Sequence, residues 1–279
     1  LVMDNKDKVK GRVKFMFQPG EEGYKGALHM VEAGLLESPH VDAALGMHSQ
    51  SASDFATGTI MHTTGPSAAS ADGFKVIVHG KGAHGASPED GVDPVNILAH
   101  ILIALQTINS RERVQREPLI LTIGQLIAGT AENIIPNDGY LTGTIRAFNQ
   151  EVRVHAKRRL EEISQGIAAT FGATAEIEWY TEFAPTINDR AREAELDGYV
   201  RELLGDDIVK ITEPQMGSED FSEVMLRVPG AFFNISLGAR EDGYLYGAHN
   251  PQIRFDESGL PVGSAVYAHT AMRWLEENH

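Results

Sequence analysis

The chain has 279 residues, which suits one large domain or two ordinary ones, and 42% of them are hydrophobic, enough to form a buried core. Its 24 Lys and Arg against 39 Asp and Glu give a formal net charge of −15, which argues against nucleic-acid or anionic-membrane partners. There is no Cys, so disulfides, thiol nucleophiles and thiolate metal ligands are excluded within these residues. No run approaches the roughly 20 apolar residues that span a bilayer, and the start lacks a signal-peptide pattern. The sequence therefore predicts a cytoplasmic protein.

The first part of the chain has the pattern of a strand, a turn and a helix. Apolar residues alternate over 13–17, the letters QPGEEG follow, and residues 24–36 are amphipathic with a helical period. A second apolar run over 41–47 ends in His48. Strands that alternate with a helix predict a mainly parallel α/β sheet, whose carboxyl edge is where such sheets bind ligands.

A different order of elements begins after the turn-rich letters GPSAASADG. The predicted elements alternate as βαββαβ, which is typical of the ferredoxin-like arrangement of four strands with two helices on one face. In chain order we predict a strand at 74–79, a helix at 94–109, strands at 119–126 and 140–149, a helix at 152–171 and a strand at 174–180.

After residue 184 the pattern returns to mixed α/β character. We predict helices at 192–204, 220–227 and 261–276, and strands at 208–211 and 231–237. The simplest domain organisation is an α/β domain formed by residues 1–68 and 183–279, interrupted by the βαββαβ domain at 69–182.

Glu21 and Glu22 follow the first predicted strand, and His48 ends the next one. Carboxylate and imidazole ligands suit Zn, Mn, Co or Ni. An adjacent Glu pair also allows one carboxylate to bind a metal while its neighbour takes a proton from a metal-bound water. The alternative is that two Glu at a helix start interact favourably with the helix dipole.

Two further His residues lie in Gly-rich loops. His249, in YGAHNP, is in a turn that can direct a side chain toward a cleft, although a loop His is usually solvent-exposed. His84, in GKGAHGASP, has small neighbours that permit close approach of a substrate, which is also the composition of an ordinary surface loop.

Other polar candidates have structural alternatives. Arg146, in the predicted strand LTGTIRAF, either captures a carboxylate or lies at an exposed sheet edge. Asn133, in AENIIPN, is by default a turn residue. Glu219 and Asp220, in GSEDF, either orient metal ligands or cap the helix that follows, and capping is the favoured interpretation.

Seven segments resemble, in their order, the M20 metallopeptidase family: FMFQPGEEGYKGA, ALGMH, GKGAHGASPEDGVDPV, ENIIPN, GTIRAF, MGSEDF and GAHNP. The resemblance extends over essentially the whole chain and includes the branch of N-acyl-amino-acid amidohydrolases. It implies a catalytic domain that holds two divalent metals per active site, formed by 1–68 and 183–279. It also implies that the domain at 69–182 is a lid through which such enzymes form homodimers.

The resemblance implies roles for single residues. Glu21 matches the general base of the family, and Glu22, His48 and His249 match metal ligands. In the lid, His84 matches the histidine that reaches the partner's site and stabilises the tetrahedral intermediate. Asn133 and Arg146 match residues near the substrate, with Arg146 a clamp for the amino-acid carboxylate.

Family members carry a Cys-Gly-His-Asp segment, with two more metal ligands, upstream of the QPxEE strand. This chain starts after that point, so we expect a fragment, an incompletely represented protein or a degraded variant that lacks the N-terminal part of the catalytic domain. The family function would then belong to the longer chain. Three ligands can hold one metal ion but hardly two.

The leading hypothesis is metal-dependent hydrolysis of the amide bond of N-acyl amino acids, with Glu21 as general base. The alternative is a non-catalytic dimerising or binding fragment with an incomplete metal site. A phosphate- or nucleotide-binding protein is disfavoured by the net charge and by the absence of GxGxxG and GxxxxGK[ST] patterns. Neither the acyl specificity nor the choice among Zn, Mn, Co and Ni can be read from these residues.

Overall fold

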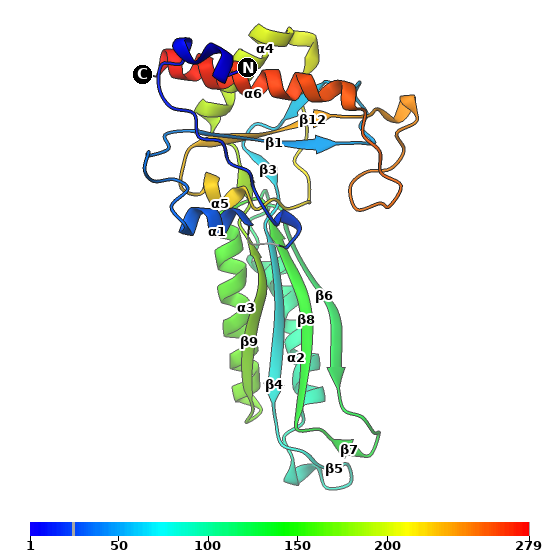
Figure 1. Cartoon of the computed structure of the whole chain (residues 1–279). Coiled ribbons are helices and arrows are strands. Elements are labelled where there is room, and N and C mark those ends of the chain that lie inside the picture. The colour runs from blue at the N-terminus through cyan, green and yellow to red at the C-terminus, as the bar shows by residue number, and fades with distance from the viewer. Residues whose placement is uncertain (24–25, 279) are drawn as a thin grey trace. The chain divides into compact units, whose positions relative to one another are not determined.

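The computed structural model describes residues 1–23 and 26–278, and the chain divides into two compact units, which are described separately (Figure 1). Unit 1 consists of Leu1–Ser67, Thr186–Gln215 and Asp220–His279, and unit 2 consists of Ala68–Pro185 and Met216–Glu219. The first unit boundary follows residue 67, where the sequence suggests 68, and the second follows residue 185, where it suggests 182. The segment Met216–Glu219 belongs to unit 2, not to the last part of the chain as predicted, because Ala69 N donates to the Gly217 carbonyl at 2.9 Å.

Unit 1 is built on a four-stranded sheet in the order β1-β12-β2-β11. The pairs β1/β12 and β2/β11 are parallel and β12/β2 is antiparallel. Two long helices, α4 and α6, pack on this sheet around buried apolar side chains that include Ile60, Val200, Phe233 and Val266. The bounds are β1 Ala44–Gln50, β2 Ile60–His62, β11 Val209–Ile211, β12 Gly230–Ser236, α4 Arg190–Leu204 and α6 Leu260–Glu277.

Two short helices of unit 1 surround a second apolar cluster. The helix α1 (Gly26–Glu32) contacts α5 (Ser222–Met225), and the buried residues there include Phe221 and Phe232. The predicted start of the first helix, residue 24, lies outside the described residues. The strands β3 (Pro66–Ala68) and β10 (Thr186–Ile187) pair with each other, and beside them Asn188 N donates to the Gly65 carbonyl at 2.8 Å.

The predicted strand at 13–17 is not formed. Residues 12–20 have no regular secondary structure, and Phe15 and Phe17 are exposed. Alternating apolar residues need a neighbouring strand to accept their backbone hydrogen bonds, and none of the described residues pairs with this segment. It is attached instead through the ammonium group of Lys14, which donates to the carbonyls of Leu35, Glu37 and Pro39 at 2.6, 2.7 and 3.0 Å.

Unit 2 contains an antiparallel sheet in the order β6-β8-β4-β9, with α2 and α3 packed against each other and against its buried side (Figure 1). Its elements follow the chain as strand, helix, strand, strand, helix, strand, apart from the two-stranded pair β5/β7. The bounds are β4 Ala71–His79, β5 Ala83–His84, α2 Pro94–Thr107, β6 Leu119–Ala128, β7 Ile134–Ile135, β8 Asp138–Ala147, α3 Gln150–Thr170 and β9 Thr174–Phe183.

Local sequence signals explain where the helices of unit 2 begin. The Asp93 carboxylate accepts from Val95 N before α2, which has Pro94 in its first turn, and Asn149 accepts from the first backbone amides of α3. The sheet and α3 are also joined by a buried ion pair, in which both oxygens of the fully buried Asp72 carboxylate accept from Arg153 at 2.8 Å.

None of the described helices is both long enough and apolar enough to cross a membrane.

Candidate functional site

The two adjacent glutamates of QPGEEG lie on a short turn of unit 1. Gly20 adopts the left-handed φ of +59° that glycine tolerates, and Glu21–Gly23 then form a single 3₁₀ turn closed by Gly23 N donating to the Gly20 carbonyl at 3.0 Å. Because Gly26 has no side chain, the Pro19 carbonyl can occupy the place where a Cβ of residue 26 would lie. The letters QPG and the second glycine of GYKGA are therefore the features that place Glu21 and Glu22.

The structure brings Glu22 and His249 together. Glu22 Oε2 lies 3.7 Å from His249 Nδ1, and both side chains are about three-quarters exposed. Two ligands of one tetrahedral ion, each bound at about 2.0–2.2 Å, are separated by about 3.4 Å, so this pair fits a shared divalent metal. His249 also has a φ of +64°, a strained conformation for a residue other than glycine, and such strain is concentrated at functional sites.

The third predicted ligand, His48, lies on β1, beside Asn234 of β12, and its side chain is exposed. Within residues 1–23 and 26–278, no three His, Asp or Glu side chains are close enough together to hold a metal ion. The structure therefore assembles a two-ligand pair from Glu22 and His249 and does not join His48 to it.

The predicted capping role of Asp220 is wrong. The helix α5 begins at Ser222 and receives no side-chain cap, whereas the Asp220 carboxylate is fully buried and accepts from Ala27 N at 2.8 Å and from the Gln18 side-chain amide. Asp220 therefore contacts the segment that carries the glutamate pair. Its neighbour Glu219 is also buried, although it belongs to unit 2.

In unit 2, His84 and Asn133 lie together on the short pair β5/β7. Gly85 N donates to the Asn133 carbonyl at 2.8 Å, and His84 is directly opposite Ile134. His84 Nδ1 accepts from Ala86 N at 3.0 Å, so the proton of the neutral ring lies on Nε2, which makes Nε2 a hydrogen-bond donor.

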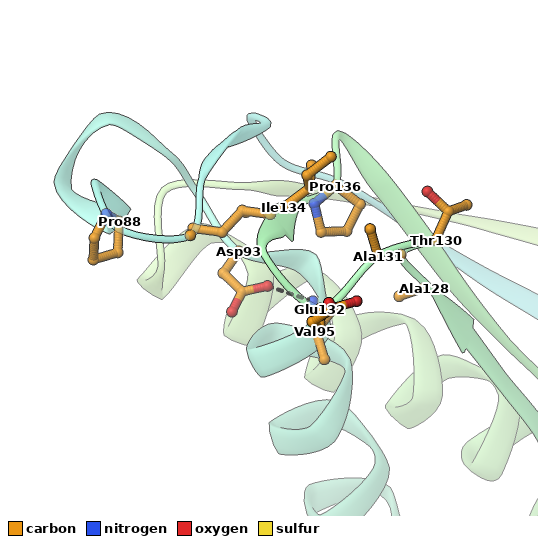
Figure 2. Close-up of a pocket in the computed structure, with 12 residues that line it drawn as sticks. Pro88, Asp93, Val95, Ala128, Thr130, Ala131, Glu132, Ile134 and Pro136 are labelled. Carbon is orange, nitrogen blue, oxygen red and sulfur yellow. Dashed lines mark hydrogen bonds between the residues drawn. The ribbon is translucent and has the colours of Figure 1, made fainter.

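A hollow of about 680 Å³ opens beside this strand pair (Figure 2). Its lining is mostly small or apolar, with Asp93 and Glu132 contributing carboxylates, and Figure 2 shows Asp93 hydrogen-bonded at the start of α2. Gly85 and Ile134, the chain neighbours of His84 and Asn133, line it.

Arg146 lies far from His84 and Asn133 within unit 2. It is near the end of β8, whereas the β5/β7 pair adjoins the start of that strand, where Gly80 N donates to the Asn137 carbonyl. The intervening length of β8 corresponds to about 25 Å at about 3.3 Å per residue. Arg146 Nη1 donates to the Met216 carbonyl at 3.0 Å.

A buried charged cluster in unit 1 has no motif to mark it in the sequence. The His62 ring on β2 lies 2.9 Å from Glu193 and 2.8 Å from Asp197, both on α4, and stacks on Phe233. Burial raises the pKa of Glu193. The cluster joins the sheet to α4.

The chain is similar to known proteins in sequence and in structure. The sequence model of peptidase family M20/M25/M40 matches residues 2–273. Thermostable carboxypeptidase 1 of Saccharolobus solfataricus is 34% identical, with 98% of this chain and 69% of that protein covered. N-acetyl-L-cysteine deacetylase of Bacillus subtilis is also 34% identical, with 100% of this chain and 64% of that protein covered. The crystal structure of the Bacillus subtilis YXEP protein, a dinuclear metal-binding peptidase from the M20 family, is 29% identical, has a TM-score of 0.77, and is covered to 68% by 99% of this chain.

Proposed function

The chain belongs to peptidase family M20/M25/M40 and is an M20-type hydrolase, and from this premise we propose that it hydrolyses the amide bond of N-acyl amino acids with Glu21 as general base. The observation that carries the proposal is the approach of Glu22 to His249 at 3.7 Å, with a second carboxylate directly adjacent in the chain. The names of the two curated relatives, a thermostable carboxypeptidase and an N-acetyl-L-cysteine deacetylase, both describe hydrolysis of an amide bond.

Glu22 and His249 are the residues that would hold a divalent metal, and His48 is proposed to complete its ligands. Such an ion, which we propose to be Zn, Mn, Co or Ni, would polarise the substrate carbonyl and acidify a water molecule. The family resemblance suggests two ions per active site.

Glu21 moves the proton in this mechanism. Its carboxylate would accept a proton from the attacking water and deliver it to the nitrogen of the departing amino acid. Because Glu21 and Glu22 are adjacent on one 3₁₀ turn, one side chain can bind while the other transfers the proton.

Unit 2 is proposed to be a ferredoxin-like lid that forms a homodimer. Arg146 would bind the substrate carboxylate through its guanidinium. His84 would donate Nε2–H to the developing oxyanion, close to Asn133. Along β8, about 25 Å separate Arg146 from the level of the β5/β7 pair that carries His84. Both side chains therefore cannot contact one small substrate in the same chain, and we assign His84 to the partner's site.

The test combines metal binding with an activity assay. Calorimetric titration with Mn²⁺ and Zn²⁺ should show binding that His249→Ala weakens and that the control His40→Ala, at another exposed histidine, leaves unchanged. The metal-loaded protein should release the amino acid from N-acetyl and N-benzoyl amino acids. Dimers that bind no metal and hydrolyse neither substrate would support the alternative of a non-catalytic binding fragment.

A further inference from the structure

Asp220 contacts both sides of the segment that carries the glutamate pair. Its Oδ1 accepts from the Gln18 side-chain amide, ahead of Glu21, and its Oδ2 accepts from Ala27 N, after Glu22, at 2.8 Å. Gln18 and Ala27 are nine residues apart, and Asp220 is about two hundred residues from either in the sequence. One carboxylate therefore contacts the chain both before and after the Glu21–Glu22 turn.

The position of Asp220 is itself well determined by packing. The adjacent Phe221 is 5% exposed and lies against Phe232, with ring centroids 5.6 Å apart. Gly46 of β1 makes room for both rings, because a side chain there would collide with them.

A buried carboxylate in this arrangement restricts the turn more strongly than a surface contact does. Asp220 is fully buried, so its oxygens have no exposed surface through which water could replace a lost partner. Hydrogen bonds to an ionised acceptor are also stronger and more directional than neutral ones. The contacts with Gln18 and Ala27 therefore limit how far Glu21 and Glu22 can move.

We propose that Asp220 is a positioning residue for the Glu21–Glu22 turn, and that it sets the metal affinity of Glu22 and the turnover that depends on Glu21 without itself contacting substrate. The inference rests on the proposed function of these two glutamates. Residues that support metal ligands from behind contribute about 10–100-fold in metal affinity or activity in other proteins.

Three variants test the proposal. Asp220→Ala removes both contacts. Asp220→Asn keeps an acceptor oxygen, and rotation of the Gln18 amide can restore the second contact, so its effect should be smaller. The control is Asp189→Ala, which removes another unit 1 carboxylate that accepts from backbone amides at a helix start, those of Ala191 and Arg192 before α4.

Hydrogen–deuterium exchange is the readout that does not depend on activity. Asp220→Ala should raise exchange in peptides that cover residues 18–27, and Asp189→Ala should not. Mn²⁺ affinity measured by calorimetry should fall by about 10–100-fold in Asp220→Ala. At saturating Mn²⁺, kcat should fall while KM changes little, since substrate contacts remain. Asp220→Asn should recover part of each loss.

The proposal is overturned if a folded Asp220→Ala protein shows unchanged hydrogen–deuterium exchange over residues 18–27. It is also overturned if the Mn²⁺ affinity and kcat of Asp220→Ala equal those of the Asp189→Ala control. If Asp220→Ala does not fold, Asp220→Asn and Gln18→Ala, which each weaken one side of the contact, are compared by the same exchange measurement. If the unmodified protein neither binds Mn²⁺ nor hydrolyses N-acyl amino acids, the proposed function fails, and the exchange comparison alone then decides whether Asp220 holds the turn.

Discussion

Two inactive variants of this protein should restore each other's activity when they share a dimer. Glu21→Gln removes the proposed base, and His84→Ala removes the proposed oxyanion donor. If each site combines Glu21 of one subunit with His84 of the partner subunit, a mixed dimer contains one site with both residues intact and one site with neither. Each pure variant contains no intact site.

The size of the recovery follows from the geometry and from random pairing. Along β8, about 25 Å separate the level of the β5/β7 pair from Arg146, so His84 and Arg146 of one chain cannot contact the same small substrate. Random pairing of equal amounts gives half mixed dimers in a closed two-fold assembly, and each has one working site of two. The mixture should therefore recover about a quarter of the unmodified activity.

The assay mixes the purified variants under conditions that exchange subunits and follows release of the amino acid from an N-acyl amino acid. Native mass spectrometry quantifies the mixed dimer. A matched control mixes Glu21→Gln with Glu22→Ala, which should recover nothing because each site then lacks one of the two glutamates. Absence of recovery in a sample that contains mixed dimers, or a monomeric protein that is fully active, would refute the assignment of His84 to the partner's site.

Three further predictions concern single substitutions. Glu21→Gln should abolish turnover and leave Mn²⁺ affinity largely intact, whereas Glu22→Gln should weaken Mn²⁺ binding. If calorimetry gives the reverse pattern, Glu22 is the general base and Glu21 is the metal ligand. Asp72→Ala leaves the buried Arg153 guanidinium without its carboxylate partner. It should lower the free energy of unfolding by about 3–5 kcal/mol in urea denaturation, whereas removal of an exposed helix ion pair should lower it by about 0–1 kcal/mol. The hydrogen bond to Asp138, 2.7 Å from the ring, raises the pKa of His79 above 6.5. The contribution of this contact to the free energy of unfolding is therefore fully present below pH 6.5 and is lost as the pH rises through the raised pKa. In Asp138→Asn, the NMR titration of His79 should move to lower pH, and an unchanged midpoint would contradict this cause.

The elements of unit 2 are readable from the sequence because their periodic patterns are long and their ends carry local signals. The helix predicted at 152–171 is α3, Gln150–Thr170, and Asn149 caps it. The segment 13–17 differs because alternation shows which side chains share a face, whereas a strand also needs a neighbour for its backbone. None of the described residues supplies that neighbour.

The site was less accessible to sequence reasoning than the fold. The short segments around Glu22 and His249 mark candidate ligands, and the turn chemistry of QPGEEG suggests where one of them lies, but their approach depends on folding that joins residues more than two hundred positions apart. The same holds for Asp220, whose partners Gln18 and Ala27 lie at the other end of the chain. A carboxylate before a short helix has the same pattern whether it caps that helix or binds a distant segment.

The division of unit 1 into separated segments has a consequence for synthesis on the ribosome. β1 pairs with β12, and 180 positions separate Gln50 from Gly230. At typical elongation rates, β12 is therefore synthesised on the order of 10–40 s after β1. Ala68–Pro185, which is contiguous and forms all of unit 2 except Met216–Glu219, is synthesised during that interval. Once it has folded, Gly65 and Asn188, which are 123 positions apart, are joined by a compact body in place of a flexible loop. Shortening a loop of that length to a few residues lowers the entropic cost of closing it by about 3 kcal/mol. Folding of the inserted unit therefore favours assembly of the unit whose segments lie before and after it in the sequence.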